Sequence, residues 1–286
     1  MEHNKNTYFI YYAKIGDLKE VCNMLENENI DIESTDNYGD TALHAAAISG
    51  HVKVMEYLTS KGANVNSKVH CNSTGKDGTT PIFYAVMKGH IDATKILINK
   101  GADTGVVVNK FDLLDASIGS NNPQLIDLIL GLGYCINRHN LRGDTPLAYS
   151  LEHNKDRAIK LLLEEKGADY RKCCTDGSSP LARAVLDRTG SSVRLLLKYV
   201  SDKEGQESLP SYVNHKIVSE GGRTPLHIAC VVENYFAVKI LLSNSADPSI
   251  VDDNGLLASD LLVGLVDQHT CNQIKLLLGN STKITR

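Results

Sequence analysis

The chain has 286 residues, of which 34 are acidic and 30 are basic, and its formal net charge at pH 7 is −4. This mild negative charge argues against nucleic acid as the main partner, because proteins that bind nucleic acids usually carry a basic surface. No run of about 18 apolar residues is present, so we expect no membrane-spanning segment. The apolar stretch 8–13 is too short for a secretory signal and lacks a basic region leading into a cleavage site.

The seven cysteines are odd in number and scattered, without the spacing of metal ligands. Free thiols in a reducing compartment are therefore expected. That compartment is the cytoplasm or, for a protein exported by a route without a cleaved signal, a host cytosol. The pair Cys173-Cys174 lies between two predicted helix pairs, and no further ligand stands at a useful spacing. We expect ordinary exposed thiols there and no metal site.

The first predicted elements are two helices, 8–14 and 18–26, on either side of Gly16-Asp17. Residues 1–6 are expected to form a loose start, as chain termini often do. This helix pair lacks the motif that recurs further along the chain, which is typical of the terminal unit of a stack.

The stretch 36–66 predicts a turn followed by two antiparallel helices. Thr41 is suited to cap the first helix, because its hydroxyl can accept a backbone N–H at the helix start. Gly50 separates the two helices, and Gly62 is suited to the left-handed conformation that ends the second. Such a unit is too small to bury its own apolar face, so it must stack against neighbours.

The beginning of this first helix repeats along the chain. The pattern is Thr-Ala-Leu-His at 41–44 and Thr-Pro-Leu-His at 224–227, with related versions at 80–83, 145–148 and 179–182. The end of the second helix repeats as Gly-Ala-Asn at 62–64, Gly-Ala-Asp at 101–103 and 167–169, and Ser-Ala-Asp at 245–247. On these residues the chain resembles ankyrin-repeat proteins, whose period is about 33 residues and whose signature is Thr-Pro-Leu-His-x-Ala.

The resemblance implies an all-α fold, an ankyrin-repeat solenoid of about eight helix-turn-helix units with short β-hairpin loops. It covers nearly the whole chain, so we expect a single domain. The predicted domain is 1–286, with repeats 7–37 (N-terminal cap), 38–75, 76–110, 111–141, 142–175, 176–220, 221–253 and 254–280 (C-terminal cap), and a tail 281–286.

Four stretches depart from the regular pattern. Residues 111–118 lack the capping Thr and the Pro, although Pro123 stands where a second helix would begin. The hairpin 67–76 is about six residues longer than the period requires, and 201–219 about twelve. Both are polar, and we expect surface loops. In the last pair, 255–279, two aspartates are expected to interrupt the first helix.

Histidine is the residue type that most resembles a catalytic or ligating group here. His44 and His227 stand at one position of the repeat, so we expect each imidazole to hydrogen-bond the neighbouring hairpin. His51 and His90 follow the glycine between the two helices and are interpreted in the same way. No Ser/His/Asp set, carboxylate pair or Gly-rich cofactor loop stands out. We therefore expect no catalytic residues, no cofactor and no metal, with an enzyme using a hidden Cys or His as the less favoured alternative.

The resemblance also implies a concave binding surface made of hairpin tips and first helices. The hairpin positions are Asn37, Tyr38, Asp40, Lys76, Asp77, Thr79, Leu141, Arg142, Asp144, Thr175, Asp176, Ser178, Glu220, Gly221 and Arg223. The first-helix positions are Ile48, Ser49, Met87, Lys88, Glu152, His153, Leu186, Asp187, Val231 and Val232.

One first-helix position on this surface is apolar in four repeats: Ile48, Met87, Leu186 and Val231. Exposed apolar positions that recur in this way indicate that a partner's apolar groups lie along the groove. The alternative is that the two long inserts cover these side chains by local packing.

We therefore expect a non-catalytic, monomeric protein-interaction scaffold in the cytoplasm that binds one or more protein partners and no nucleic acid. The rival is an effector of an intracellular bacterium or virus that engages a host protein through the same surface. Plentiful asparagine and lysine, which suggest an AT-rich genome, favour the rival weakly. The last helix pair ends almost at the terminus, so we expect no ubiquitin-ligase-recruiting segment of the kind seen in many poxvirus ankyrin proteins.

Overall fold

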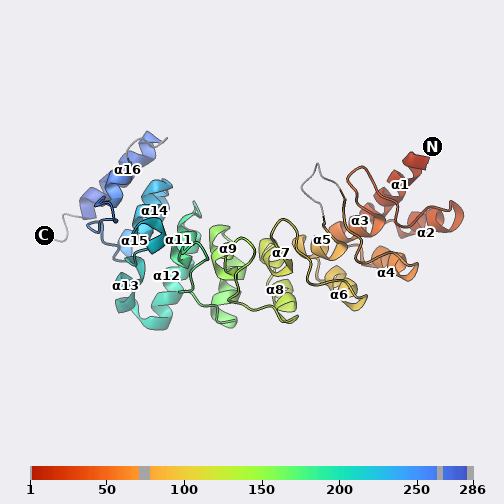
Figure 1. Cartoon of the computed structure of the whole chain (residues 1–286), viewed down its shortest axis with the longest axis horizontal. Coiled ribbons are helices and arrows are strands. Elements are labelled where there is room, and N and C mark those ends of the chain that lie inside the picture. The colour runs from red at the N-terminus through yellow and green to blue at the C-terminus, as the bar shows by residue number, and fades with distance from the viewer. Residues whose placement is uncertain (1, 71–77, 263–266, 282–286) are drawn as a thin grey trace. The chain divides into compact units, whose positions relative to one another are not determined.

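The computed structural model describes residues 2–70, 78–262 and 267–281 (Figure 1). Within these ranges every regular element is a helix, and strand pairing is limited to isolated bridges such as Thr35–Thr41 and Ile217–Arg223. The expected all-α fold is confirmed. The chain divides into two compact units, Met1–Tyr134 and Cys135–Arg286.

The described part of the first unit contains four antiparallel helix pairs. Their bounds are α1 (Glu2–Ile15), α2 (Leu18–Asn27), α3 (Ala42–Ser49), α4 (Val52–Ser60), α5 (Pro81–Met87), α6 (Ile91–Asn99), α7 (Leu113–Ser120) and α8 (Pro123–Leu130). The first helices α1, α3, α5 and α7 pack side by side in one row, and α2, α4 and α6 form a second row behind them.

The described part of the second unit has the same plan with additional short elements. These are α9 (Pro146–Glu152), α10 (Asp156–Lys160), the π-helical turn η1 (Leu161–Glu165), α11 (Pro180–Val185), α12 (Ser191–Glu204), η2 (Gln206–Ser208), α13 (Leu209–Val213), η3 (Val218–Glu220), α14 (Pro225–Val231), α15 (Tyr235–Ser243), η4 (Ala258–Leu262) and α16 (Gln268–Ser281). Here α9, α11, α14 and η4 form the first-helix row.

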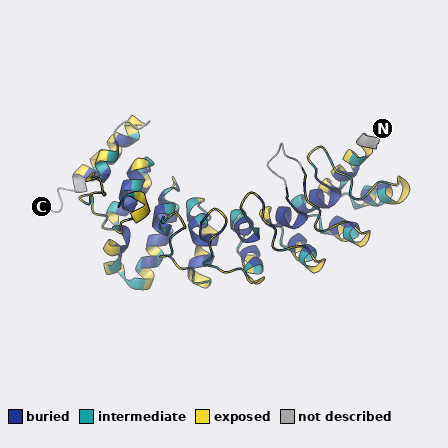
Figure 2. Cartoon of the chain, viewed as in Figure 1, coloured by how far each residue is buried: buried dark blue, intermediate teal, exposed yellow. Residues whose placement is uncertain are grey.

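Burial follows the two rows, with the faces between helices closed to solvent (Figure 2). In α3 the side chains of Ala45, Ala46 and Ala47 are nearly or fully buried. Because they are small, the neighbouring first helices can approach closely. The second helix contributes its apolar stripe, of which Met55 and Leu58 are fully buried.

Several hairpins are built by a short side-chain acceptor followed by a glycine. The Asp36 carboxylate accepts the N–H groups of Tyr38 and Asp40 at 2.8 and 3.0 Å, and Gly39 has φ of +80°. In the second unit Asn140 is the side-chain acceptor and Gly143 is the glycine with positive φ. Only glycine adopts such a φ without steric cost, which favours it at these turns, whereas Asn109 and Lys110 take positive φ in the hairpin 108–111.

The fourth helix pair is regular, although its sequence lacks the usual start signal. Asp112 replaces threonine as the cap of α7, and its carboxylate accepts the N–H groups of Leu114 and Asp115 at 2.9 and 3.1 Å. Asp115 in turn accepts the N–H of Asp112, which completes a capping box. Pro123 begins α8, as expected.

Two expectations about irregular segments are wrong. Residues 2–6 are helical, since α1 begins at Glu2. The segment 201–219 is no surface loop: α12 continues to Glu204, and α13 follows after one turn of η2. This part of the segment is helical because Leu209, Tyr212 and Val213 stand at helical spacing and are buried together as an apolar stripe. Of the other long hairpin, residues 71–77 lie outside the described residues, and Val69 just before them is fully buried.

Histidine side chains join neighbouring repeats, as predicted. His44 Nδ1 accepts the N–H of Thr41, and Nε2 donates to the carbonyl oxygen of Thr79 at 3.2 Å. His227 makes the equivalent bond to Leu256 at 3.1 Å. His51 and His90 also bond carbonyl oxygens of the preceding repeat, at 3.0 and 2.9 Å. These imidazoles are therefore structural.

We expect unfolding to become easier at mildly acidic pH because of His44. Burial lowers the pKa of His44 to about 4, against 6.5 for the unfolded chain. The unfolded state therefore takes up a proton first as the pH falls, so stability present above pH 6.5 is lost progressively towards pH 4. Between pH 7 and pH 5 the loss is about 2 kcal/mol by this linkage. Urea unfolding at both pH values measures it, and an equal loss in His44→Gln would contradict the assignment.

Gly50 and Gly62 both have positive φ, but only Gly50 is packed closely against a side chain of the next repeat. Gly50 has φ of +73°, and a Cβ there would lie 2.7 Å from Nδ1 of His90. Gly62 has φ of +96° but open space around it. Gly62→Ala should therefore cost about 1 kcal/mol from backbone strain alone. Gly50→Ala should cost about 2, because the His90 hydrogen bond is disturbed as well. Thermal or urea unfolding of the two variants separates the effects, and equal costs would contradict the close packing.

Candidate functional site

A groove of about 290 Å³ lies in the first unit, between the first hairpin and the helices α1, α3 and α5. Five residues that the sequence assigned to the binding surface converge on it: Tyr38, Asp40, Ile48, Met87 and Lys88. The helix α1 adds Ile10 and Lys14, which sequence reasoning did not include, and α5 adds Tyr84. The helix α1 lacks the repeat motif and so carries no positional signal, which is why Ile10 and Lys14 could not be assigned from the motif.

The groove combines an apolar surface with charged groups. Met87 is 39% exposed and Tyr38 is 56% exposed, whereas Ile48 is half-buried. Lys14 and Lys88 are exposed, while Asp36 is half-buried and Asp40 is buried. A partly apolar surface with a few charged groups is what a docking segment of another protein requires.

Tyr84 stands next to the acidic side of this groove. Its ring packs edge-on against His44, with 5.9 Å between ring centroids. Burial, together with the nearby Asp40 carboxylate, raises the pKa of the Tyr84 hydroxyl above its ordinary value. Tyr84 therefore stays neutral at physiological pH and does not serve as a general base in the groove.

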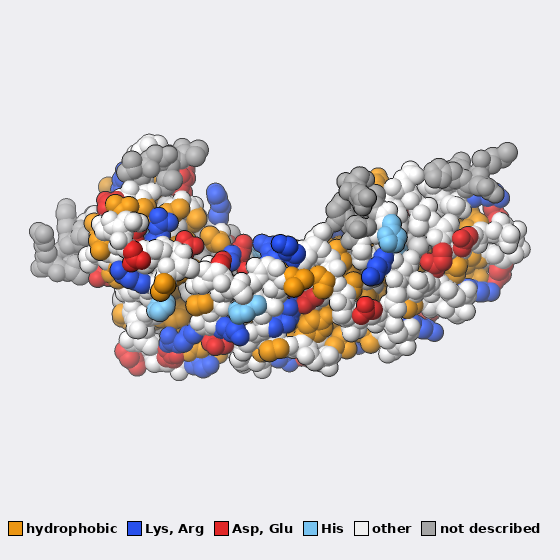
Figure 3. Space-filling model, in the orientation of Figure 1, with side chains coloured by type: hydrophobic (Ala, Val, Ile, Leu, Met, Phe, Trp, Pro, Cys, Tyr) orange, Lys and Arg blue, Asp and Glu red, His pale blue; other side chains and the backbone are white. Residues whose placement is uncertain are grey.

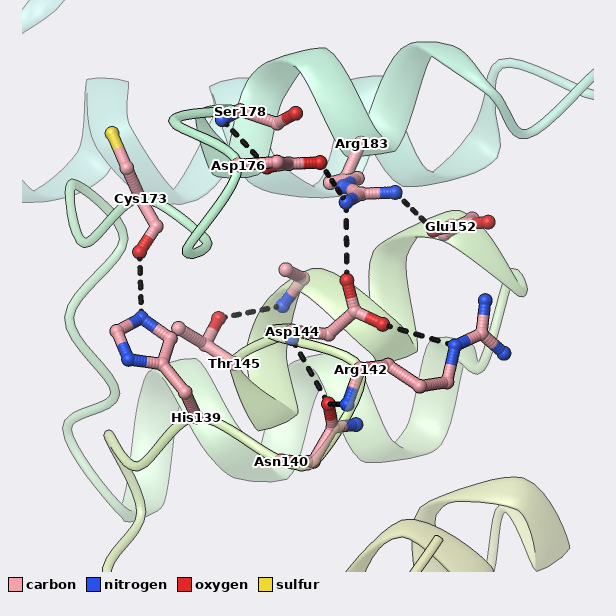
Figure 4. Close-up of polar contacts among 11 residues, drawn as sticks. His139, Asn140, Arg142, Asp144, Thr145, Glu152, Cys173, Asp176, Ser178 and Arg183 are labelled. Atoms are coloured by element: carbon pink, nitrogen blue, oxygen red, sulfur yellow. Dashed lines mark hydrogen bonds and ion pairs between the residues drawn. The ribbon is translucent and has the colours of Figure 1, made fainter. Parts of the chain in front are cut away.

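In the second unit the predicted surface residues form an ion-pair cluster (Figure 4). The guanidinium of Arg183, on α11, contacts the carboxylates of Asp144, Glu152 and Asp176 at 3.1, 3.1 and 2.6 Å. Arg142 approaches Asp144 from the other side at 3.6 Å. Sequence reasoning missed Arg183, because its partners lie on another repeat or on the preceding hairpin.

The expected outward orientation is wrong for three aspartates and for two other hairpin residues, Thr79 and Ser178, which are 3% and 7% exposed. Asp40, Asp144 and Asp187 are only 6%, 2% and 5% exposed. Asp144 turns inward to meet Arg183. Asp187 accepts the backbone N–H groups of Thr189 and Ser192 at 3.0 Å each, so it orders the turn before α12. These carboxylates shape the hairpins and turns, and the accessible surface belongs to their neighbours.

The remaining predicted residues lie as follows. Leu141 is 69% exposed, Val231 is 37% exposed, and Asn37, Arg142 and His153 are exposed, whereas Ser49, Glu152, Leu186, Arg223 and Val232 are half-buried. Lys76 and Asp77 lie outside the described residues. Ile48 and Met87 belong to the first unit, and Leu186 and Val231 to the second. On the face seen in Figure 3, hydrophobic side chains are interspersed with both acidic and basic ones.

Three cysteines, Cys173, Cys174 and Cys230, have the properties of inert thiols. Cys174 is 5% exposed, which corrects the expected exposed thiol at that position. Burial raises the pKa of Cys173, Cys174 and Cys230, the last to about 12. A raised pKa disfavours the thiolate, which is the nucleophilic form. Within the described ranges, no three His, Cys, Asp or Glu side chains are grouped closely enough to hold a metal ion.

Comparison with known protein families gives matches along most of the chain. A model described as ankyrin repeats (3 copies) matches residues 1–69 and 113–207. A model of the single ankyrin repeat matches 77–110 and 221–253. The chain belongs to the ankyrin-repeat family. No helix within residues 2–70, 78–262 and 267–281 has the length and hydropathy that a membrane crossing requires.

Curated relatives share this repeat over part of their length. The putative ankyrin repeat protein L371 of Acanthamoeba polyphaga mimivirus is 30% identical over 43% of this chain and 14% of its own. The human transient receptor potential cation channel subfamily A member 1 is 25% identical over 84% of this chain and 18% of its own. The putative ankyrin repeat protein FPV031 of fowlpox virus is 29% identical over 43% and 34%. The matched part of the chain thus spans about a third or less of these relatives.

Proposed function

We propose that this ankyrin-repeat protein is a non-catalytic scaffold that binds a partner protein through its hairpin tips and first helices. Ankyrin repeats are in general protein-interaction modules. The proposal places the protein in the cytoplasm or a host cytosol, as a monomer, with protein and no nucleic acid as partner. The repeat boundaries and the single domain inferred from the sequence stay part of this proposal.

The observation that carries the proposal is the groove of the first unit. Three repeats contribute to it: Ile10 from α1, Ile48 from α3 and Met87 from α5. Ile48 and Met87 stand beside Lys14 and Lys88 on one surface, whereas Ile10 lines the groove but is only 4% exposed. The centre of a protein interface typically has such apolar anchors surrounded by a polar rim. Met87 is the last residue of α5 and is 39% exposed. Packing of the core therefore does not explain an apolar side chain at this position.

We expect Met87→Glu to abolish capture of the partner while the protein stays folded. Truncating or charging an anchor at an interface centre typically costs more than about 2 kcal/mol, whereas rim changes cost little. The matched control is Leu132→Glu, since Leu132 is 38% exposed and does not line the groove. Immobilised wild type and both variants are compared for proteins captured from a cell lysate, with circular dichroism as the folding check. A protein retained equally by all three would contradict the proposal for this groove.

Leu186→Glu applies the same test to the second unit. Leu186 is the equivalent repeat position, at the end of α11, and is half-buried. A partner that spans both units should be weakened by either change, and a partner of the first unit alone only by Met87→Glu. An unfolded Leu186→Glu protein would show instead that this side chain belongs to the core.

A second candidate function is that of a viral effector that engages a host protein. The observation that favours it is the similarity to putative ankyrin repeat proteins of a mimivirus and of fowlpox virus, each over 43% of this chain. The same groove would then bind a host partner. Capture from host lysate that depends on Met87, with no capture from lysate of uninfected non-host cells, is the result this candidate requires.

A further inference from the structure

Opposite charges gather at the two ends of the first-unit groove. The charged residues that line it are Lys14, Lys88, Asp36 and Asp40. The two aspartates belong to the hairpin before α3. Lys14 lies in the last turn of α1, and Lys88 is the residue at which α5 ends. The hairpin end of the groove is therefore acidic, and the end made by the helix C-termini is basic.

The helix C-termini that carry the lysines are aligned by contacts between repeats. His51, just after α3, donates to the carbonyl oxygen of Lys14 at 3.0 Å, and His90, just after α5, donates to that of Ile48 at 2.9 Å. The helices α1, α3 and α5 therefore end next to one another, side by side in one row (Figure 1). α3 has eight residues and a length of about 12 Å, which separates the basic end from the hairpin.

The accessible charge differs between the two ends. Lys14 and Lys88 are exposed, and within the described residues no ion pair joins either of them to a carboxylate. Asp36 is half-buried, and its carboxylate accepts two backbone N–H groups of its own hairpin. These bonds hold the carboxylate in place without removing its charge. Asp40 is buried beside Tyr84, so Asp36 is the carboxylate that a ligand can approach.

The surface between the two ends is apolar. Ile10 and Ala45 are 4% and 3% exposed and form the inner wall, while Ile48 is half-buried and Met87 is 39% exposed. An extended chain advances about 3.3 Å per residue, so a length of about 12 Å corresponds to three or four residues. The groove thus matches a short segment that carries an apolar residue between two charges of opposite sign.

We propose that the partner segment docked in this groove is an extended stretch with one bulky apolar side chain on Ile48 and Met87, an acidic residue on one side of it paired with Lys14 or Lys88, and a basic residue on the other side facing Asp36. The inference rests on the proposed function of the groove and makes its partner specific. A segment with charges of one sign leaves one end of the groove unpaired, so the order of charges decides which partners bind.

The test identifies the segments that the groove accepts. A phage library of random 12-residue peptides is selected on the full chain and depleted on Met87→Glu, so that the remaining peptides depend on the groove. Their affinities are measured by fluorescence anisotropy. We expect enrichment of peptides in which a bulky apolar residue has Asp or Glu on one side and Lys or Arg on the other, within about two residues of it.

Reversal of the basic end is the first arm of the test. Lys14→Glu combined with Lys88→Glu should weaken the selected peptides at least about tenfold. Changing the acidic residue of a peptide to Lys should restore its binding to this variant, which shows that the variant is folded. The matched control is Lys53→Glu combined with Lys95→Glu, because these lysines are exposed on α4 and α6 and do not line the groove. The control should leave the affinity unchanged.

Removal of the acidic charge is the second arm. Asp36→Asn keeps an acceptor oxygen for the hairpin N–H groups, since Asn140 accepts the same two bonds in the second unit. The melting temperature should therefore stay unchanged, while the selected peptides bind several-fold more weakly. A peptide whose basic residue is replaced by Gln should bind the wild type and Asp36→Asn equally.

The outcomes separate this inference from the proposed function. Groove-dependent peptides that lack the two opposite charges would overturn the inference and leave the proposed function standing. So would an affinity that the lysine reversal does not change, or a peptide with the reversed charge that does not regain binding. If no selected peptide depends on Met87, both the inference and the role of the groove are overturned.

Discussion

Leu241→Ala should lower the free energy of unfolding by about 2–5 kcal/mol, the usual cost of a cavity left by leucine in a packed interior. Leu241 lies on α15 and is fully buried. The helices α12, α14 and α16 pack against α15. The removed methyl groups therefore leave contacts unfilled on both sides of the repeat. In a stack, stability depends on each interface with the next unit, so the loss weakens the whole second unit.

The matched control for this change is Leu276→Ala. Leu276 lies on the last helix, α16, and is 67% exposed. The same truncation there should stay within about 0.5 kcal/mol. Urea unfolding followed by circular dichroism gives both midpoints. Equal shifts for the two leucines would show that α15 is not packed between its neighbours as described.

Arg183→Leu is expected to destabilise the second unit by about 2–4 kcal/mol. The change removes the cation that three carboxylates share, and Asp144, with 3% of its side chain exposed, keeps its charge in a buried place. Removing one partner of a fully buried ion pair typically costs roughly 3–5 kcal/mol. The expected cost is lower here because Arg142 remains 3.6 Å from Asp144.

A double variant separates charge from packing at this cluster. If the unpaired carboxylate is the cause, Asp144→Asn added to Arg183→Leu should recover at least about 1 kcal/mol, since the buried charge is gone. The control is Lys61→Met, which breaks the exposed pair with Glu26 at 3.1 Å and should leave the unfolding midpoint nearly unchanged. Urea unfolding measures all of them. No recovery in the double variant would contradict the electrostatic origin.

The sequence predicted most of the helices because their signals are local. Thr41, Gly50 and Gly62 each mark a boundary that the structure places at the start of α3, at the end of α3 and just after α4. The segment 201–219 was wrongly expected to be a loop because its mostly polar composition hides a short apolar stripe. Leu209, Tyr212 and Val213, spaced by three and one residues, were the signal for α13.

The candidate sites were only partly predictable, because they depend on pairs far apart in the sequence. The repeat register indicated that Tyr38, Ile48 and Met87 lie on one surface, and the first-unit groove brings them together. The register could not show that Asp144 turns towards Arg183, because the same repeat position as Arg183 holds Tyr84 in the first unit. Side-chain direction at these positions is decided by the particular neighbour in the next repeat.

The bonds between repeats in the first unit have a consequence for how the chain is made. Asn66 donates to the carbonyl oxygen of Gly101 and accepts the N–H of Asp103. His44 donates to the carbonyl oxygen of Thr79, which is also synthesised later. In these bonds a repeat is completed by groups that leave the ribosome about one repeat later. Folding can follow synthesis step by step, since domains form from the N-terminus as the chain emerges. A nascent chain stalled after Lys100 should therefore hold a folded first repeat and an exposed, half-bonded last one.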